Sequence, residues 1–260
     1  MQHPKLFSLV IILACLLLGC SGNNATNSDK DSTSVSNSSA AASGNDYYYE
    51  LTTNTSGKNL SITGITKMFV SAKGDMRMEM QIHNSANGDK ASAPIILIAH
   101  ADKPGESIGI DDSAKTYTVN HFDSADLNTG FKTQSTASKI GEEKILGFNC
   151  VHARIISNKK MGSFFDETDT VDLWKSNEVP MQPSVKKLMD QFESRTGNTM
   201  YSPETAAQLK QMGCDGFMVK MQMGNKNTAV IMQLTKVERK DFPSGMFEIP
   251  AGYKENKSGM

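Results

Sequence analysis

Hydrophobic and polar residues alternate along most of the chain after residue 46, which predicts a domain built mainly of β-strands. Successive side chains of a strand point to opposite faces, so the alternation over residues 76–83 and 217–223 gives each of these strands an apolar face. Residues 95–98 form a continuous apolar run, which predicts a strand buried on both faces. Further strands are expected at 47–51, 65–70, 107–110, 116–122, 142–146, 149–157, 171–175 and 229–239.

Two short helices are predicted to interrupt the strands. Residues 185–192 carry apolar side chains at the i, i+3, i+4 and i+7 positions of one helix face. A second helix is expected with Ser202 as its N-cap, Pro203 as its first residue and Gly213 at its end. The whole order predicts an α+β fold that is mainly β: a strongly curved antiparallel sheet, or half-barrel, with a short helical insertion packed on one side. Its concave face must be filled by helices or by a ligand.

The first 46 residues have a different pattern, which predicts export and attachment to a membrane. Lys5 precedes an apolar run over residues 6–18, which is shorter than the roughly 20 residues of a membrane span and fits a signal peptide. The run ends at Leu17-Leu18-Gly19-Cys20, which resembles the bacterial lipobox. We therefore expect residues 1–19 to be removed and Cys20 to carry acyl chains, each buried CH₂ of which contributes roughly 0.8 kcal/mol to membrane binding. An ordinary signal peptide or a short membrane anchor is the alternative.

The residues after Cys20 predict which membrane holds the chain and where the folded domain begins. Ser21 stands where an Asp would favour retention in the inner membrane, so by resemblance the outer membrane, facing the periplasm, is favoured. Small and polar residues dominate up to residue 46 and cannot bury enough apolar surface to fold, so residues 20–46 are expected to form a disordered tether. The β-rich domain is then expected over residues 47–253, with a tail at 254–260.

Charge and motifs exclude several classes of function. The 27 Lys and Arg nearly balance the 28 Asp and Glu, which argues against nucleic-acid binding because that normally needs a basic excess. The sequence has no phosphate-binding loop, and its histidines lack the spacing of metal ligands. We therefore expect no enzymatic activity, no cofactor and no metal site.

Two cysteines remain in the expected mature domain, Cys150 and Cys214. In a compartment that can be oxidising, they could form a disulfide, and the alternative is a pair of buried thiols. The sequence leaves both open.

Methionine is unusually frequent, with 16 residues, and several lie on strand faces. Because Met is flexible and polarizable, it lines apolar surfaces that adapt to varied partners. Three interpretations compete: an ordinary core, a hydrophobic groove for an acyl chain, and a Cu(I) site, which soft thioether ligands would suit. The candidate ligand face comprises Met76, Met78, Met80, Phe217, Val219, Met221 and Met223.

Several short motifs, in order along the chain, resemble those of an uncharacterised family of bacterial envelope proteins. They are the Arg- and Met-rich strand after Gly74, the Asp-turn-Lys-x-Tyr hairpin at 110–117, the Ile-x-Gly-aromatic-x-Cys step that ends at Cys150, Trp174 followed by Pro180, and the closing residues 247–253. That family is a domain of unknown function and is similar to the LolA/LolB-like lipoprotein-carrier half-barrels. The resemblance implies this fold and a hydrophobic ligand, a lipid or the acyl part of another lipoprotein.

The resemblance also has a limit that bears on function. A soluble carrier crosses the periplasm, whereas Cys20 would fix this chain to a membrane, so a receptor-like or local lipid-handling role fits better. A non-catalytic interaction or scaffold module of the envelope, without a ligand, is the alternative. The sequence does not identify a protein partner.

Overall fold

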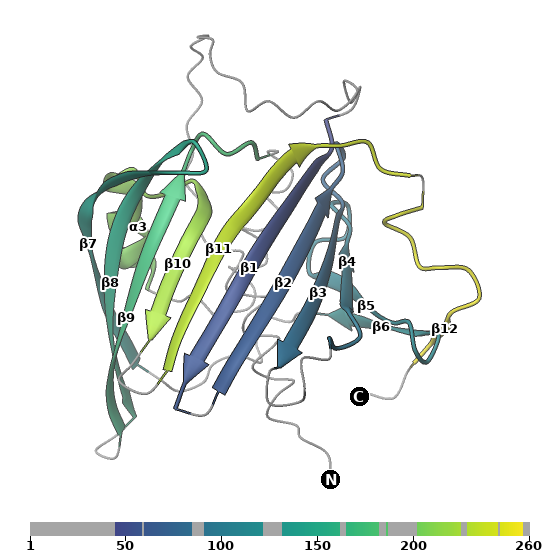
Figure 1. The fold of residues 1–260 in the computed structure, drawn as a ribbon, viewed down its shortest axis with the longest axis horizontal. Helices are drawn as coiled ribbons and strands as arrows, with labels where there is room; N and C mark the ends of the chain where they lie inside the picture. The colour runs from purple at the N-terminus through teal and green to yellow at the C-terminus, as the bar shows by residue number, and fades with distance from the viewer. Residues whose placement is uncertain are drawn as a thin grey trace.

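The computed structural model describes residues 45–58, 60–84, 91–121, 132–161, 165–181, 186, 202–224, 228–243 and 245–256 (Figure 1). The expected signal peptide and tether, and nearly all of the helix predicted at 185–192, lie outside these residues. The described elements are β1 (Tyr47–Gly57), β2 (Leu60–Val70), β3 (Met76–Asn84), β4 (Ile95–Ala99), β5 (Glu106–Asp111), β6 (Thr116–His121), β7 (Lys132–Ile145), β8 (Phe148–Met161), β9 (Phe165–Ser176), α3 (Pro203–Gln211), β10 (Phe217–Gly224), β11 (Thr228–Arg239) and β12 (Lys254–Glu255).

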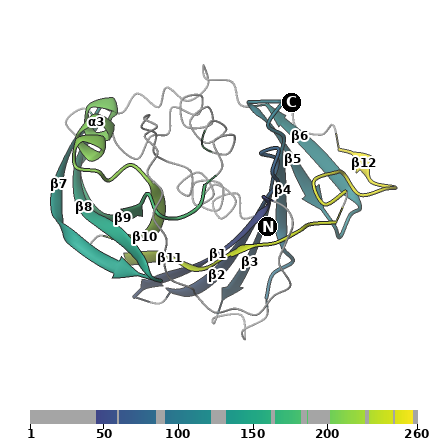
Figure 2. The same cartoon turned by 90° about the horizontal axis from the view of Figure 1, so that it is seen from above.

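All the strands belong to one sheet, whose order is β12-β6-β5-β4-β3-β2-β1-β11-β10-β9-β8-β7. The chain starts in the middle of the sheet, runs outward as a meander from β1 to β6, and returns from the opposite edge at β7 to the middle at β11. Neighbouring strands are antiparallel, except that β12 runs parallel to β6. Viewed from above, the sheet bends into an open curve whose two edges stay apart (Figure 2). The predicted half-barrel with a short helix is confirmed.

The two halves of the sheet join where the first strand meets the last long one. Strands β1 and β11 pair from Tyr47↔Arg239 to Gly57↔Thr228, with a register shift between Glu50 and Leu51. Similar shifts occur in the β7–β8 and β9–β10 pairs. Because a β-bulge bends its strand and increases the local twist, these irregularities favour the strong curvature of the sheet.

The helix α3 begins and ends as its sequence predicts. Ser202 is the N-cap and its hydroxyl accepts a hydrogen bond from the Thr205 N–H, while a proline occupies the first turn. At the other end Gly213 has φ 74°, and the Cys214 N–H donates to the Leu209 carbonyl at 2.8 Å. This is a Schellman motif, which glycine favours because it tolerates positive φ. No helix among the described residues is both long enough and apolar enough to span a membrane.

Helix α3 also covers the β7 edge of the sheet. The Gln208 side chain accepts a hydrogen bond from the Ala137 N–H at 2.8 Å, and the Thr205 hydroxyl donates to the Ser135 carbonyl at 2.8 Å. An uncovered edge strand offers unpaired backbone groups to other chains. The helix therefore satisfies two of the backbone groups along this edge.

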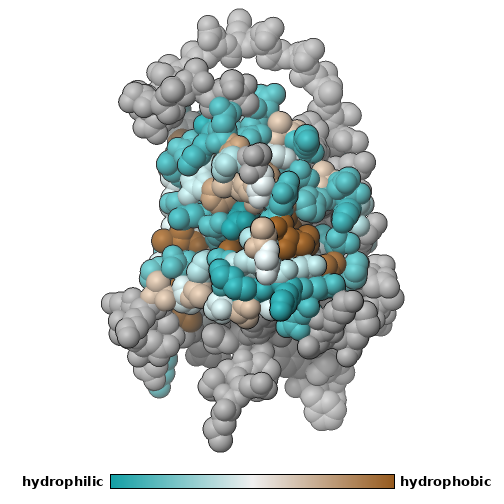
Figure 3. Space-filling view, turned by 90° about the vertical axis from the view of Figure 1, so that its right-hand side faces the viewer, coloured by the Kyte–Doolittle hydropathy of each residue, from teal (hydrophilic) through white to brown (hydrophobic). Residues whose placement is uncertain are grey.

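The outer face of the sheet carries a small second core. Ile96 and Ile98 of β4 and Ile108 and Ile110 of β5 are buried there, and partly buried side chains of the C-terminal segment, such as Phe247, pack against them. Ile95 and Leu97 point the other way, into the main core. The prediction that residues 95–98 are buried on both faces is therefore correct. On the side of the molecule that carries these strands, hydrophobic surface shows only in patches between hydrophilic side chains (Figure 3).

Candidate functional site

The apolar residues that the sequence singled out converge on the inner face of the curved sheet. Met76, Met78 and Met80 of β3 belong to the same buried cluster as Phe217, Val219 and Met221 of β10, and Met223 is partly buried against it. Strand alternation places the three β3 side chains on one face, as predicted. The structure thus brings the whole candidate ligand face into one cluster.

The two methionine stripes are not adjacent, because β2, β1 and β11 lie between β3 and β10. At a strand spacing of about 4.8 Å, the stripes are roughly 19 Å apart along the sheet. Buried side chains of the three central strands fill the interval and make the apolar surface continuous; they are Met68, Val70, Tyr49, Leu51, Met232 and Leu234. A single Cu(I) site shared by the two stripes would need sulfur atoms much closer together.

Tyr49 occupies the centre of this face. Its ring stacks on Phe217, with 5.1 Å between centroids and 14° between planes. Its hydroxyl donates a 2.6 Å hydrogen bond to the carbonyl of Pro180. Burial, and to a smaller extent the nearby Tyr47, raises the pKa of Tyr49 above its ordinary value. The neutral phenol therefore ties the segment after β9 to the centre of the sheet.

Polar side chains interrupt the inner face at a few positions that the sequence analysis did not identify. Thr53 follows Leu51 on the same face of β1, and Ser157 follows Ile155 on the same face of β8; they are 3% and 2% exposed. Within the described part of the chain, neither hydroxyl has a hydrogen-bond partner. Leaving such a group unsatisfied costs about 1–3 kcal/mol. The only signal in the sequence was a small polar residue at a position where the alternation requires an inward side chain.

A lysine is also buried on this face. Lys175 is 1% exposed and follows Leu173 with strand alternation, so it lies on the inner side of β9. Charged side chains are rarely buried to this extent. The inner face is therefore apolar over most of its area, with hydroxyls and one ammonium at particular points.

Cys150 and Cys214 are both buried and no disulfide joins them in the structure, which corresponds to the buried-thiol alternative. The Cys150 thiol donates to the Phe148 carbonyl at 3.5 Å, and the Cys214 thiol donates to the Val151 carbonyl at 3.7 Å. Each sulfur is directed at a carbonyl of β8 instead of at the other sulfur. Burial raises the pKa of the Cys150 thiol, which keeps it protonated and unreactive.

The outer face carries a polar cluster around Trp174. Its ring stacks on His152 at 4.0 Å between centroids, and the Lys220 ammonium lies 4.2 Å from its centroid. Asp172 accepts hydrogen bonds from His152 and from Arg154. Burial opposes ionisation of Asp172, but these hydrogen bonds and charges prevail and keep its pKa below the ordinary value. The cluster packs the outer side of β8, β9 and β10 and has no access to the inner face.

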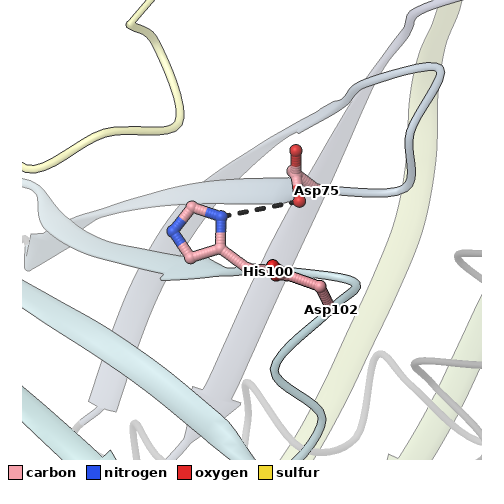
Figure 4. Close-up of side chains that lie close together, drawn as sticks. All are labelled: Asp75, His100 and Asp102. Atoms are coloured by element: carbon pink, nitrogen blue, oxygen red, sulfur yellow. Dashed lines mark ion pairs between the residues drawn. The ribbon is translucent and has the colours of Figure 1, made fainter.

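Potential metal ligands meet at a different place. Asp75, His100 and Asp102 come from the turns before β3 and after β4, and one ligand atom of each lies within 4.8 Å of the others (Figure 4). This grouping was missed because the three residues are separated in sequence and only the pairing of β3 with β4 brings them together.

Comparison with known proteins identifies a family. The family described as "Domain of unknown function (DUF4412)" matches residues 50–253. The resemblance to a family of unknown function, inferred from motifs between residues 47 and 253, is confirmed. No curated protein has detectable sequence similarity to the chain.

Several solved structures have a loosely similar chain course. LprF from Mycobacterium bovis is 8% identical, with 76% of this chain and 88% of LprF aligned at a TM-score of 0.32. The lipoprotein LppX from Mycobacterium tuberculosis is 8% identical over 75% of this chain and 88% of its own, with a TM-score of 0.33. A putative outer membrane lipoprotein-sorting protein domain from Vibrio parahaemolyticus is 8% identical over 78% of this chain and 89% of its own, with a TM-score of 0.32.

Proposed function

This chain belongs to the DUF4412 family, and on that premise we propose that it is a non-catalytic, membrane-anchored lipoprotein of the bacterial envelope that binds a lipid or acyl chain on its inner face. The observation that carries the proposal is the continuous, methionine-rich apolar surface on the concave side of an open sheet. Thioether side chains adapt their shape to flexible hydrocarbon, so such a surface suits acyl chains of varied length.

The buried hydroxyls of the inner face favour an amphiphile over a plain hydrocarbon. Thr53 and Ser157 lie among apolar neighbours, and the described residues offer their hydroxyls no partner. An ester or carboxyl oxygen of a lipid would accept a hydrogen bond from either group and remove the cost of burying it unsatisfied. The ligand is therefore proposed to be a lipid whose polar linkage reaches the inner face.

The anchor sets where this binding would take place. Acyl chains on Cys20 would hold the domain at a membrane, with the outer membrane and its periplasmic side as the proposed location. A tethered domain encounters lipids or acylated proteins of one membrane surface at high local concentration. A local or receptor-like role in lipid handling is thus favoured over transport across the periplasm.

A second candidate function is an interaction or scaffold module without a ligand. It is favoured by the burial of the candidate ligand face, since each of its members except Met223 is almost fully covered by the chain itself. In that case the methionines are ordinary core, and partners would bind elsewhere.

Identification of co-purifying lipid separates the two candidates. We suggest purifying the secreted chain with a Cys20→Ala substitution and extracting it with organic solvent for mass spectrometry, followed by titration with a fluorescent fatty acid. Lipid at near one equivalent per chain, together with saturable binding of the probe, is expected. Absence of both would overturn the lipid-binding proposal in favour of the scaffold.

Variants locate the binding surface. Met223→Glu places a charge at the least covered position of the candidate ligand face, and Thr53→Val removes a hydroxyl with little change in shape. Both should weaken probe binding, Met223→Glu by at least about tenfold, which corresponds to about 1.4 kcal/mol. Ile156→Glu is the matched control, because Ile156 is 42% exposed on the outer face of β8. Equal binding by all three variants would place the ligand elsewhere.

A further inference from the structure

Three side chains with metal-binding chemistry converge at one end of the β3–β4 pair, away from the inner apolar face. The His100 Nδ1 atom lies 3.5 Å from Asp75 Oδ1, and a carboxylate oxygen of Asp102 completes a group whose ligand atoms all lie within 4.8 Å of one another (Figure 4). Met76 pairs with Ala99 across the two strands, so the preceding Asp75 and the following His100 are held opposite each other.

Hydrogen bonds donated by backbone N–H groups fix both turns that carry these residues. The Ser71 N–H donates to the Asp75 carbonyl at 2.9 Å, and the Asp75 N–H donates to the Ser71 hydroxyl at 3.0 Å. On the other side, the Ala101 N–H donates to Asp75 Oδ1 at 3.1 Å, which ties the second turn directly to the first. Two of the three ligands are therefore positioned before any ion binds.

The charge of the group is not balanced by neighbouring cations. Of the basic side chains nearest along the chain, Arg77 pairs with Glu79 and Lys103 pairs with Glu106. The third, Lys73, is exposed and belongs to none of the ion pairs of the described residues. Among the ion pairs of the described residues, neither Asp75 nor Asp102 has a Lys or Arg partner, and Asp75 pairs only with His100. Carboxylates this close repel each other, and a bound cation would replace the repulsion by attraction.

We propose that Asp75, His100 and Asp102 form a binding site for one divalent transition-metal ion of the Zn²⁺ type. The mixed donor set selects the class of ion, because Ca²⁺ and Mg²⁺ prefer oxygen ligands alone, whereas Zn²⁺ takes imidazole nitrogen together with carboxylate oxygen. Metal–ligand bonds of about 2.0–2.2 Å bring tetrahedral donors to roughly 3.4 Å from one another. Rotation of the exposed Asp102 side chain supplies the approach that this requires.

The bound ion joins the turn before β3 to the turn after β4. Three protein ligands leave a fourth position for water or an exchangeable ligand. Since only the folded chain holds the three donors together, binding stabilises the native state. The site is independent of lipid binding on the inner face, so either proposal can fail without the other.

Zinc titration of the full chain in mild detergent tests the site. Chelator-treated protein is titrated with Zn²⁺ against a chromogenic competitor, and Co²⁺ is added separately to record the visible absorption of a protein-bound ion. We expect one Zn²⁺ per chain, a Co²⁺ spectrum typical of low coordination number, and a higher unfolding temperature with Zn²⁺.

Two ligand variants and one control variant test whether Asp75, His100 and Asp102 hold the ion. Asp102→Asn and His100→Gln should each lower Zn²⁺ affinity by at least about tenfold and abolish the shift in unfolding temperature. His121→Gln is the control, because His121 and Glu106 form a comparable pair at 4.0 Å with no third ligand among the described residues, and it should bind like the parent. Absence of saturable binding, or binding by Asp102→Asn equal to the parent, would overturn the proposal; Asp102 is exposed, so this variant should stay folded.

Discussion

Tyr49 and Pro180 lie 131 residues apart in sequence, yet the Tyr49 hydroxyl donates a 2.6 Å hydrogen bond to the Pro180 carbonyl. The contact connects the central strand of the sheet to the segment that leaves β9 toward the helical insertion. This polar contact lies at the centre of a largely apolar face and holds the segment after β9 against the central strand.

Tyr49→Phe should lower the free energy of unfolding by about 1–2 kcal/mol, because the Pro180 carbonyl loses its donor while the stacking on Phe217 remains. Urea denaturation monitored by circular dichroism measures the change. Tyr117→Phe, at a half-buried position on the outer face, is the comparison. A decrease in the free energy of unfolding smaller than the error of the measurement would show that the hydrogen bond does not hold this segment in solution.

Thr205→Val should destabilise the β7 edge, since the Thr205 hydroxyl donates to the Ser135 carbonyl and the substitution keeps the shape but removes the donor. We expect a loss of about 1–2 kcal/mol together with faster amide exchange in β7 than in the central strands. Hydrogen exchange with mass spectrometry resolves the two regions. Lys210→Ala, at an exposed position of α3, should leave amide exchange in β7 unchanged. If Thr205→Val did not speed amide exchange in β7 relative to the central strands, the role of α3 in covering this edge would be contradicted.

The buried Cys150 thiol should make the fold sensitive to alkali. Burial raises its pKa, so the folded chain holds this proton to a higher pH than the unfolded chain does. The resulting stability is fully present below the unfolded pKa, about 8.5, and is lost as the pH rises through the folded pKa. The free energy of unfolding should therefore fall more steeply above pH 9 in the parent than in Cys150→Ala.

Alkylation provides an independent measurement on the same thiols. Because Cys150 and Cys214 are buried and not joined by a disulfide, iodoacetamide without reductant should label neither in the native protein and both in the denatured protein. Denatured protein that stays unlabelled until reductant is added would show that the two cysteines are bonded in solution.

Phe247→Ala should open the small core on the outer face. The Phe247 ring packs against the buried isoleucines of β4 and β5 and lies edge-on to Phe242 at 6.0 Å. Because Phe247 is only partly buried, we expect a cost of about 1–3 kcal/mol, less than for a fully buried phenylalanine. Increased binding of a hydrophobic dye would report the exposed surface. Phe247→Leu should retain most of the stability, and an equal loss in both variants would contradict a packing role.

Features that depend on neighbouring residues in the chain could be predicted from the sequence. The inward faces of β3 and β10 followed from alternation, and the two-sided burial of residues 95–98 followed from their continuous apolar character. The cap of α3 at Ser202 and its end at Gly213 followed from the side-chain and backbone preferences of those residues. Each of these features is decided by physics that acts within a few residues.

Features that depend on contacts between distant segments were decided only by the tertiary structure. Many strands of this chain have the same two-residue period, so the period does not say that β1 pairs with β11 or that three strands separate the methionine stripes. For the same reason, the proximity of Asp75, His100 and Asp102 could not be predicted from the sequence. Nor could the sequence decide whether Cys150 and Cys214 form a disulfide. The sequence by itself determined which side chains face inward, because that depends on local alternation. The tertiary structure decided which of them meet, because that depends on long-range pairing and on the curvature of the whole sheet.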